Sequence, residues 1–141
     1  MKIAMRVFTP LLLCVGLAAC SSGAPPAAGF PADALTTTTS DSGSLRVEVR
    51  SSPQPPVRGT DSLELTVTGA SDGAARDGLK ITVTPSMPAM GHGSADATVT
   101  PQGKGKYLVT DVYMYMAGTW VLKTTFSGPV SDHVELSFSI Q

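Results

Sequence analysis

Methionine and histidine are the residues of this sequence whose types and spacing could do chemistry. Met1 and Met5 lie in the first few residues, and the other four Met form two clusters, Met87-Pro88-Ala89-Met90-Gly91-His92 and Met114-Tyr115-Met116. Thioether sulfur is soft and uncharged, which makes it a poor ligand for Mg²⁺, Ca²⁺ or Zn²⁺ and a good one for Cu(I). We therefore predict a Cu(I) site that uses three or four ligands from this pool: Met87, Met90, His92, Met114 and Met116.

A β-hairpin is expected to bring the two clusters together. Gly-rich sequence within residues 101–105 predicts the turn. A hairpin centred there would place His92 opposite Met114 and Met90 opposite Met116, and directly opposed side chains have Cβ atoms about 5 Å apart. A register shift of one residue would separate them, so this convergence is a hypothesis about strand register.

Each cluster also has a purely structural interpretation. Met114 and Met116 alternate with Tyr residues and could be a core-facing stripe, an alternative as good as the ligand interpretation. Met90 and His92 are expected in a Pro/Gly loop, and this position favours the ligand interpretation for the first cluster. As a ligand His92 would be neutral imidazole, so Cu(I) affinity should weaken below about pH 6. His133 lies on the polar face of the last expected strand and is predicted to be a surface residue.

Other chemistries find little support. Gly69-Ala70-Ser71-Asp72-Gly73 fits the G-x-S-x-G pattern of hydrolases, but it lies between two expected strands and predicts a turn. Carboxylates are scattered without a recognisable acid–base pair, so we expect no enzyme. The net charge is −1 and no Lys/Arg run occurs, which disfavours nucleic-acid binding.

The N-terminus predicts export and lipidation. Lys2 and Arg6 precede a short apolar stretch, and Leu17-Ala18-Ala19-Cys20 resembles the lipobox of bacterial lipoproteins. The resemblance implies that a signal peptide, residues 1–19, is removed and that Cys20 is acylated. It also implies an anchor in the cell envelope, in the outer membrane facing the periplasm. No thiol would then remain for a thiolate metal site or a disulfide.

Beyond Cys20 the sequence divides into a spacer and one domain. Residues 20–43 are rich in Ala, Pro, Ser and Thr and are expected to be a disordered linker. Residues 44–141 contain about seven segments in which apolar and polar side chains alternate, separated by Gly, Pro and Asp. This pattern predicts an all-β, immunoglobulin-like sandwich with Trp120 in its core.

Three motifs resemble the YtkA-like domain, a family whose relatives include FixH-type proteins. They are Met87-Pro88-Ala89-Met90-Gly91-His92-Gly93, Gly105-Lys106-Tyr107 and Met116-Ala117-Gly118-Thr119-Trp120. The resemblance implies an immunoglobulin-like sandwich in the cell envelope, connected with copper handling or oxidase assembly. The Met and His set is also similar to that of periplasmic copper carriers such as CopC and the Cu(A)-site chaperones, although its spacing differs.

The sequence therefore supports two alternative functions. The first is a lipid-anchored copper carrier or buffer, with a copper-handling or oxidase-assembly protein as its partner. The second is an interaction module that binds no metal and docks another envelope protein. It would use an exposed Tyr113/Tyr115 surface or a sheet edge.

Overall fold

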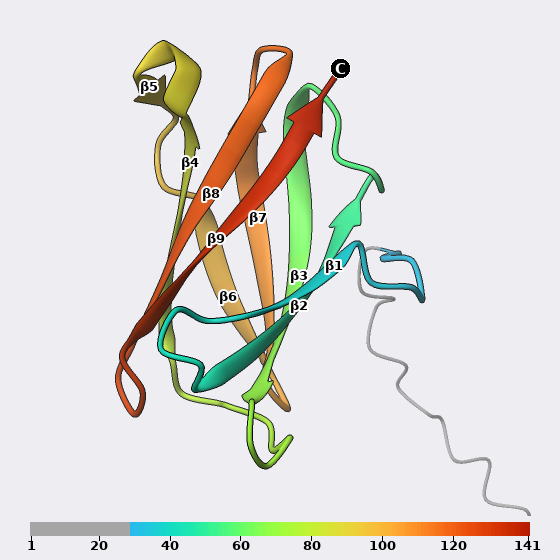
Figure 1. Cartoon of the computed structure of the whole chain (residues 1–141). Coiled ribbons are helices and arrows are strands. Elements are labelled where there is room, and N and C mark those ends of the chain that lie inside the picture. The colour runs from blue at the N-terminus through green and yellow to red at the C-terminus, as the bar shows by residue number, and fades with distance from the viewer. Residues whose placement is uncertain (1–28) are drawn as a thin grey trace, which may run out of the picture.

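A computed structural model describes residues 29–141 of the chain (Figure 1). The expected signal peptide, Cys20 and the first part of the expected linker lie outside the described residues. Within residues 29–141, no helix is long and apolar enough to span a bilayer. The described elements are β1 (Thr36–Thr39), β2 (Leu45–Ser52), β3 (Gly59–Gly69), β4 (Lys80–Met87), the 3-10 helix η1 (Pro88–Met90), β5 (His92–Gly93), β6 (Thr98–Gly103), β7 (Lys106–Met114), β8 (Gly118–Ser127) and β9 (Asp132–Ile140).

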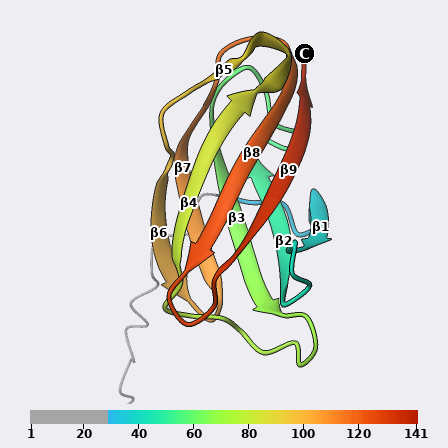
Figure 2. The ribbon, with the colours of Figure 1, turned by 60° about the vertical axis from the view of Figure 1, so that its left-hand side comes forward.

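The strands form a sandwich of two antiparallel sheets, as predicted. One sheet has the order β1-β2-β3-β7-β6 and the other β5-β4-β8-β9. Figure 2 shows β4, β8 and β9 lying across the sheet that contains β2, β3 and β7. Because side chains alternate along a strand, one face of each sheet supplies apolar residues to a shared core. Trp120 is fully buried there, as expected.

The folded domain begins earlier than the sequence predicted. Residues 36–39, assigned to the linker, form β1, which pairs antiparallel with β2 so that Thr36 lies opposite Val49. The four Thr carry no bulky apolar group, which is why composition indicated a linker. Thr is nevertheless a good strand former, and the edge of β2 offers it a complete backbone ladder.

Asp132 connects the β1–β2 turn to the start of β9. Its carboxylate accepts hydrogen bonds from the Ser44 hydroxyl at 2.7 Å and from the Ser42 hydroxyl at 2.5 Å. Desolvation opposes ionisation of this carboxyl, but hydrogen bonds from Ser40, Ser42 and Ser44 outweigh it and hold the pKa of Asp132 well below its usual range.

Tyr107 anchors the β3–β4 connection. Its buried hydroxyl donates to the carbonyl of Arg76 at 2.8 Å and accepts from the N–H of Leu79 at 3.2 Å. The Gly69–Gly73 segment forms a turn, in which the N–H of Gly73 donates to the carbonyl of Gly69. The turn interpretation of the G-x-S-x-G pattern is thus confirmed.

Candidate functional site

The predicted hairpin exists, but its register does not bring the two Met clusters together. β6 and β7 pair around a turn at residues 103–106, with Thr98 opposite Thr110, and the ladder ends at Thr98. His92 instead pairs with Met87 in the other sheet. The predicted opposition of His92 to Met114, and of Met90 to Met116, is therefore wrong.

Local backbone chemistry explains this error. Gly91 adopts a left-handed conformation with φ of 68° and reverses the chain, so that β5 folds back on the end of β4. The chain then crosses to the other sheet, and the N–H of Ala97 donates to the carbonyl of Val83 during this crossing. A hairpin argument treats both arms as one continuous ladder and cannot foresee a change of sheet.

The two clusters converge nonetheless, across the end of the sandwich. The hydroxyl of Tyr115 lies 2.7 Å from Nδ1 of His92, and the two rings stack with centroids 5.9 Å apart. Ser94 donates a hydrogen bond to the carbonyl of Tyr113 at 2.5 Å. The loop after β4 and the turn after β7 are thus joined by side-chain contacts between the sheets.

The four Met of the predicted ligand pool divide into two classes. Met87 is 3% exposed and Met114 is 0% exposed, so their sulfur atoms pack in the core. Met90 is 55% exposed and Met116 is 37% exposed. His92 is exposed as well. The accessible soft donors at this end are therefore Met90, Met116 and His92.

A buried tryptophan holds the second cluster in place. The indole N–H of Trp120 donates to the carbonyl of Met116 at 2.9 Å, and its ring meets that of Tyr115 edge to face at 5.3 Å. Gly118 has a φ of 134°, and a Cβ atom there would lie 3.0 Å from the Met87 methyl group. The Met116–Trp120 motif thus fixes the turn that presents Met116 and Tyr115.

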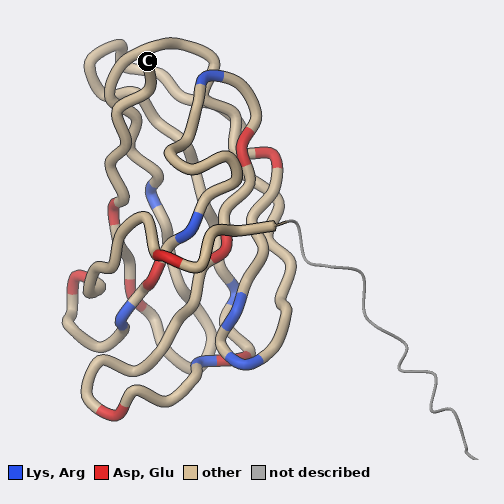
Figure 3. Tube along the Cα trace, turned by 90° about the vertical axis from the view of Figure 1, so that its right-hand side faces the viewer, with Lys and Arg blue, Asp and Glu red and all other residues tan. Residues whose placement is uncertain are grey.

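The two segments that carry these donors contain no charged residue. Residues 86–95 and 112–122 contain no Asp, Glu, Lys or Arg. In Figure 3 a basic segment lies near the C-terminus, and most of the charged residues lie farther along the sandwich. The exposed Arg58 directly precedes Gly59, which pairs with Met114, so the neighbouring β2–β3 loop adds a positive charge. A neutral site of thioether and imidazole donors suits a soft monovalent cation and offers nothing to a hard divalent one. No group of three His, Cys, Asp or Glu side chains that could hold a metal occurs within residues 29–141.

The tyrosine contact bears on how His92 could act as a ligand. Neutral imidazole carries one N–H, and a nitrogen binds a metal only through its lone pair. If Nδ1–H donates to the Tyr115 oxygen, Nε2 keeps a free lone pair. Tyr115, which the sequence assigned to an exposed aromatic pair or, at least as well, to packing, can therefore orient the imidazole.

Asp61 is a buried carboxyl at the base of the neighbouring β2–β3 loop. It is 1% exposed, and its Oδ1 accepts the N–H of Val57 at 3.2 Å. Its Oδ2 has no hydrogen-bond partner among the described residues. Desolvation raises the pKa of Asp61, and the hydrogen bond from Val57 only partly offsets it.

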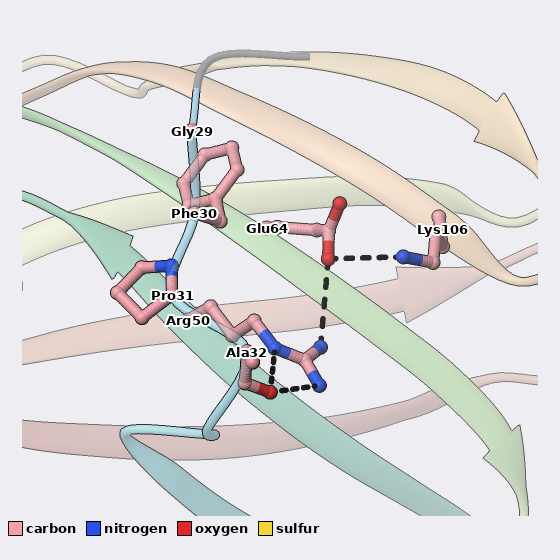
Figure 4. Close-up of a pocket in the computed structure, with 7 residues that line it drawn as sticks. All are labelled: Gly29, Phe30, Pro31, Ala32, Arg50, Glu64 and Lys106. Atoms are coloured by element: carbon pink, nitrogen blue, oxygen red, sulfur yellow. Dashed lines mark hydrogen bonds and ion pairs between the residues drawn. The ribbon is translucent and has the colours of Figure 1, made fainter. Parts of the chain in front are cut away.

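A second candidate site lies on the outer face of the five-stranded sheet (Figure 4). A pocket of about 330 Å³ is lined by Gly29, Phe30, Pro31, Ala32, Arg50, Glu64 and Lys106. Glu64 accepts from Lys106 at 3.1 Å and from Arg50 at 3.5 Å, and Arg50 also donates to the carbonyl of Ala32 at 3.2 Å. Arg50 also pairs with Glu48, so two carboxylates balance the two cations, and the hydrogen bond to Ala32 attaches residues 29–32 to the sheet.

The family of the chain follows from a match of the YtkA-like family model to residues 39–125. The chain belongs to the YtkA-like family. The match spans β2 to most of β8 and includes both Met clusters. The YtkA-like assignment made from the three motifs is thus confirmed.

The sequence and structure were also compared with solved structures and with curated proteins. Among solved structures, the YtkA-like chain is similar to a copper-bound variant of FetP from uropathogenic Escherichia coli. The two are 9% identical, the TM-score is 0.48, and the likeness covers 73% of this chain and 91% of that chain. A likeness at this level does not describe the ligand of the present protein. No curated protein matches the sequence.

Proposed function

We propose that this YtkA-like protein binds Cu(I) at the end of the sandwich through Met90, Met116 and Nε2 of His92. The observation that carries the proposal is the contact between Tyr115 and His92, which joins the loop of Met90 and His92 to the turn of Met116. Met90, Met116 and His92 are all exposed there, on two loops without charged residues. Two thioethers and one imidazole form a neutral set of three donors that matches Cu(I). The role would be carriage or buffering of copper without turnover.

The core positions of Met87 and Met114 favour a supporting role for both. A buried thioether would have to leave the core to reach a metal at the surface, and that would open a cavity, in the case of Met87 beneath Gly118. We therefore assign them to packing below the site.

A competitive Cu(I) titration tests the proposal. Met90→Leu and His92→Ala each remove one donor from an exposed position and should weaken affinity at least about tenfold. Met90→Leu should leave stability nearly unchanged, whereas His92→Ala also loses the contact with Tyr115, so its melting temperature is measured alongside. His133→Ala, an exposed His near the other end of the sandwich, is the matched control and should bind like the wild type. Equal affinity in all four proteins would contradict the proposed ligand set.

We further propose that the protein acts as a lipoprotein of the bacterial envelope, anchored through acylated Cys20. The lipobox-like sequence supports this proposal, as do the short apolar segment before it and the Ala/Pro/Ser/Thr stretch after it. Metabolic labelling with an alkynyl fatty acid should label the wild type and leave Cys20→Ala unlabelled.

A second candidate function is docking of another envelope protein at the same end. The large hydrophobic residues exposed in the described chain are Val57, Met90, Tyr113 and Met116. All four lie in or beside three loops at the same end of the sandwich (Figure 1). Apolar groups gathered in this way favour an interaction surface. Tyr113→Ser should abolish capture of a specific envelope partner while Cu(I) affinity stays unchanged.

A further inference from the structure

The four edges of the two sheets differ in how well they are protected against strand pairing. β1 has four residues and β5 has two, and β6 contains Pro101 beside a register break. The exposed part of β4 next to β5 is covered by the crossing segment, which donates to the carbonyls of Val83 and Pro85. β9 is different: it has nine residues, no Pro, Gly, Lys or Arg, and an unbroken ladder with β8. Such an edge is a template for another strand.

The backbone groups on the free side of β9 can be assigned. The N–H of Asp41, which lies outside the β8–β9 sheet, donates to the carbonyl of His133 at 2.9 Å. Because backbone groups alternate sides along a strand, the N–H and C=O groups of Glu135, Ser137 and Ser139 face the same free side. The N–H of His133 donates to the Asp132 carboxylate. The start of the edge is therefore satisfied, and the next three outward-facing residues are open.

Two hollows run beside this edge, between it and β1. The first, of about 340 Å³, lies along the end of β9 and is lined by Leu35, Thr36, Pro55, Pro56, Ser137, Phe138 and Ser139, none of which is charged. The second, of about 260 Å³, lies along the start of β9, where Asp41 and Glu135 contribute two carboxylates beside His133. The two hollows form one groove that is uncharged along the end of β9 and carries the carboxylates of Asp41 and Glu135 along its start. Asp41 lies 3.7 Å from Nε2 of His133, and Glu135 lies opposite Lys123 of β8.

We propose that β9 is a strand-addition site for an extended peptide segment of a partner protein. The peptide runs antiparallel to β9 and pairs with the open groups of Glu135, Ser137 and Ser139. Its first residues are apolar at alternate positions, where they meet the uncharged hollow. A basic residue follows opposite Glu135, because opposite charges on directly paired residues stabilise a sheet. Glu135 already lies opposite Lys123 of β8, so this residue would be its second cross-strand cation.

The open groups of Glu135, Ser137 and Ser139 are not among the proposed copper ligands, although Ile140 at the end of β9 lies opposite Gly118, two residues after Met116. β9 lies at the edge of its sheet, two strands away from β4 and the loop that carries Met90 and His92. The inference therefore holds or fails independently of Cu(I) binding.

The probe for the test is the capped peptide acetyl-Val-Thr-Val-Thr-Val-Lys-amide, titrated into the ¹⁵N-labelled protein. Saturable shifts of the amide signals of Glu135, Ser137 and Ser139 support the proposal, and the first Val should lie opposite Ile140. The same peptide with N-methylated backbone amides should bind at least about tenfold more weakly, because it cannot complete the ladder. Equal binding of the two peptides, or shifts confined to other strands, would overturn the proposal.

Two protein variants sharpen this result. Ser137→Pro removes an N–H on the free side of β9 and leaves the β8 ladder intact, whereas Ser137→Ala keeps that N–H. The Pro variant should lose peptide binding and the Ala variant should keep it. If the Pro variant fails to fold, the comparison of the unmodified and N-methylated peptides still tests whether binding needs backbone pairing with β9. A wild-type dimer that becomes a monomer on Ser137→Pro would show pairing between two copies of β9 and would also overturn the proposal.

Discussion

Tyr115 and His92, 23 residues apart in the sequence, are joined by a contact of 2.7 Å between the phenol oxygen and Nδ1. Tyr115 also rests on the buried Trp120, whose indole N–H holds the carbonyl of Met116. The orientation of the imidazole is thereby linked to the core and to the neighbouring thioether. Four predictions follow from this arrangement and from the two unusual carboxyls.

Tyr115→Phe should weaken Cu(I) binding about tenfold, since groups that orient a ligating imidazole commonly contribute that much to metal affinity. The phenyl ring still packs on Trp120, so the melting temperature should change little. Competitive Cu(I) titration together with a thermal melt measures both quantities. An unchanged affinity would mean that the hydroxyl does not orient His92 for metal binding.

The exposed and buried thioethers should respond in opposite ways. Met116→Leu should weaken Cu(I) affinity at least about tenfold at nearly constant stability. Met114→Ala should lower the free energy of unfolding by about 2–5 kcal/mol, because its side chain fills the core. Chemical denaturation and Cu(I) titration of both variants separate the roles. A Met114→Leu variant that folds normally and loses copper affinity would show that the buried sulfur is a ligand after all.

Asp132→Asn should destabilise the protein at neutral pH by about 1 kcal/mol, because the charged acceptor of the Ser42 and Ser44 hydrogen bonds is lost. The pKa of Asp132 is lower in the folded protein than in the unfolded chain. Its contribution is thus complete above the unfolded pKa and disappears as pH falls through the folded pKa. Urea unfolding from pH 7 to pH 3 should show the two proteins converging; a constant difference would contradict the prediction.

Asp61→Asn should stabilise the protein at neutral and higher pH. Burial raises the pKa of Asp61, so the folded protein binds this proton more tightly than the unfolded chain does. Wild-type stability should therefore increase as pH falls through the raised folded pKa toward the unfolded value. The amide keeps an acceptor for the Val57 N–H and does not titrate. Unfolding curves should show that the variant has the higher free energy of unfolding at pH 8. The difference in free energy between the two proteins should be smaller at pH 5.

Several features were readable from the sequence because they depend on local patterns. Alternation of apolar and polar residues located the main strands, and the same alternation placed Trp120 in the core. The Gly-rich segment at residues 101–105 marked a hairpin turn that the structure contains. These signals arise within a few neighbouring residues, so no knowledge of distant contacts is needed.

Other features depended on contacts between residues far apart in the chain. Alternation predicts the same environment for Met114 and Met116. In the structure β7 ends at Met114, so Met114 faces the core and Met116 lies on an exposed turn. The return of β5 onto β4 and the crossing to the second sheet moved His92 away from its predicted partner and toward Tyr115. Which strand becomes an open edge is likewise a property of sheet order. Sequence determined the donor types and the strands, whereas pairing across the two sheets decided which donors meet at the surface.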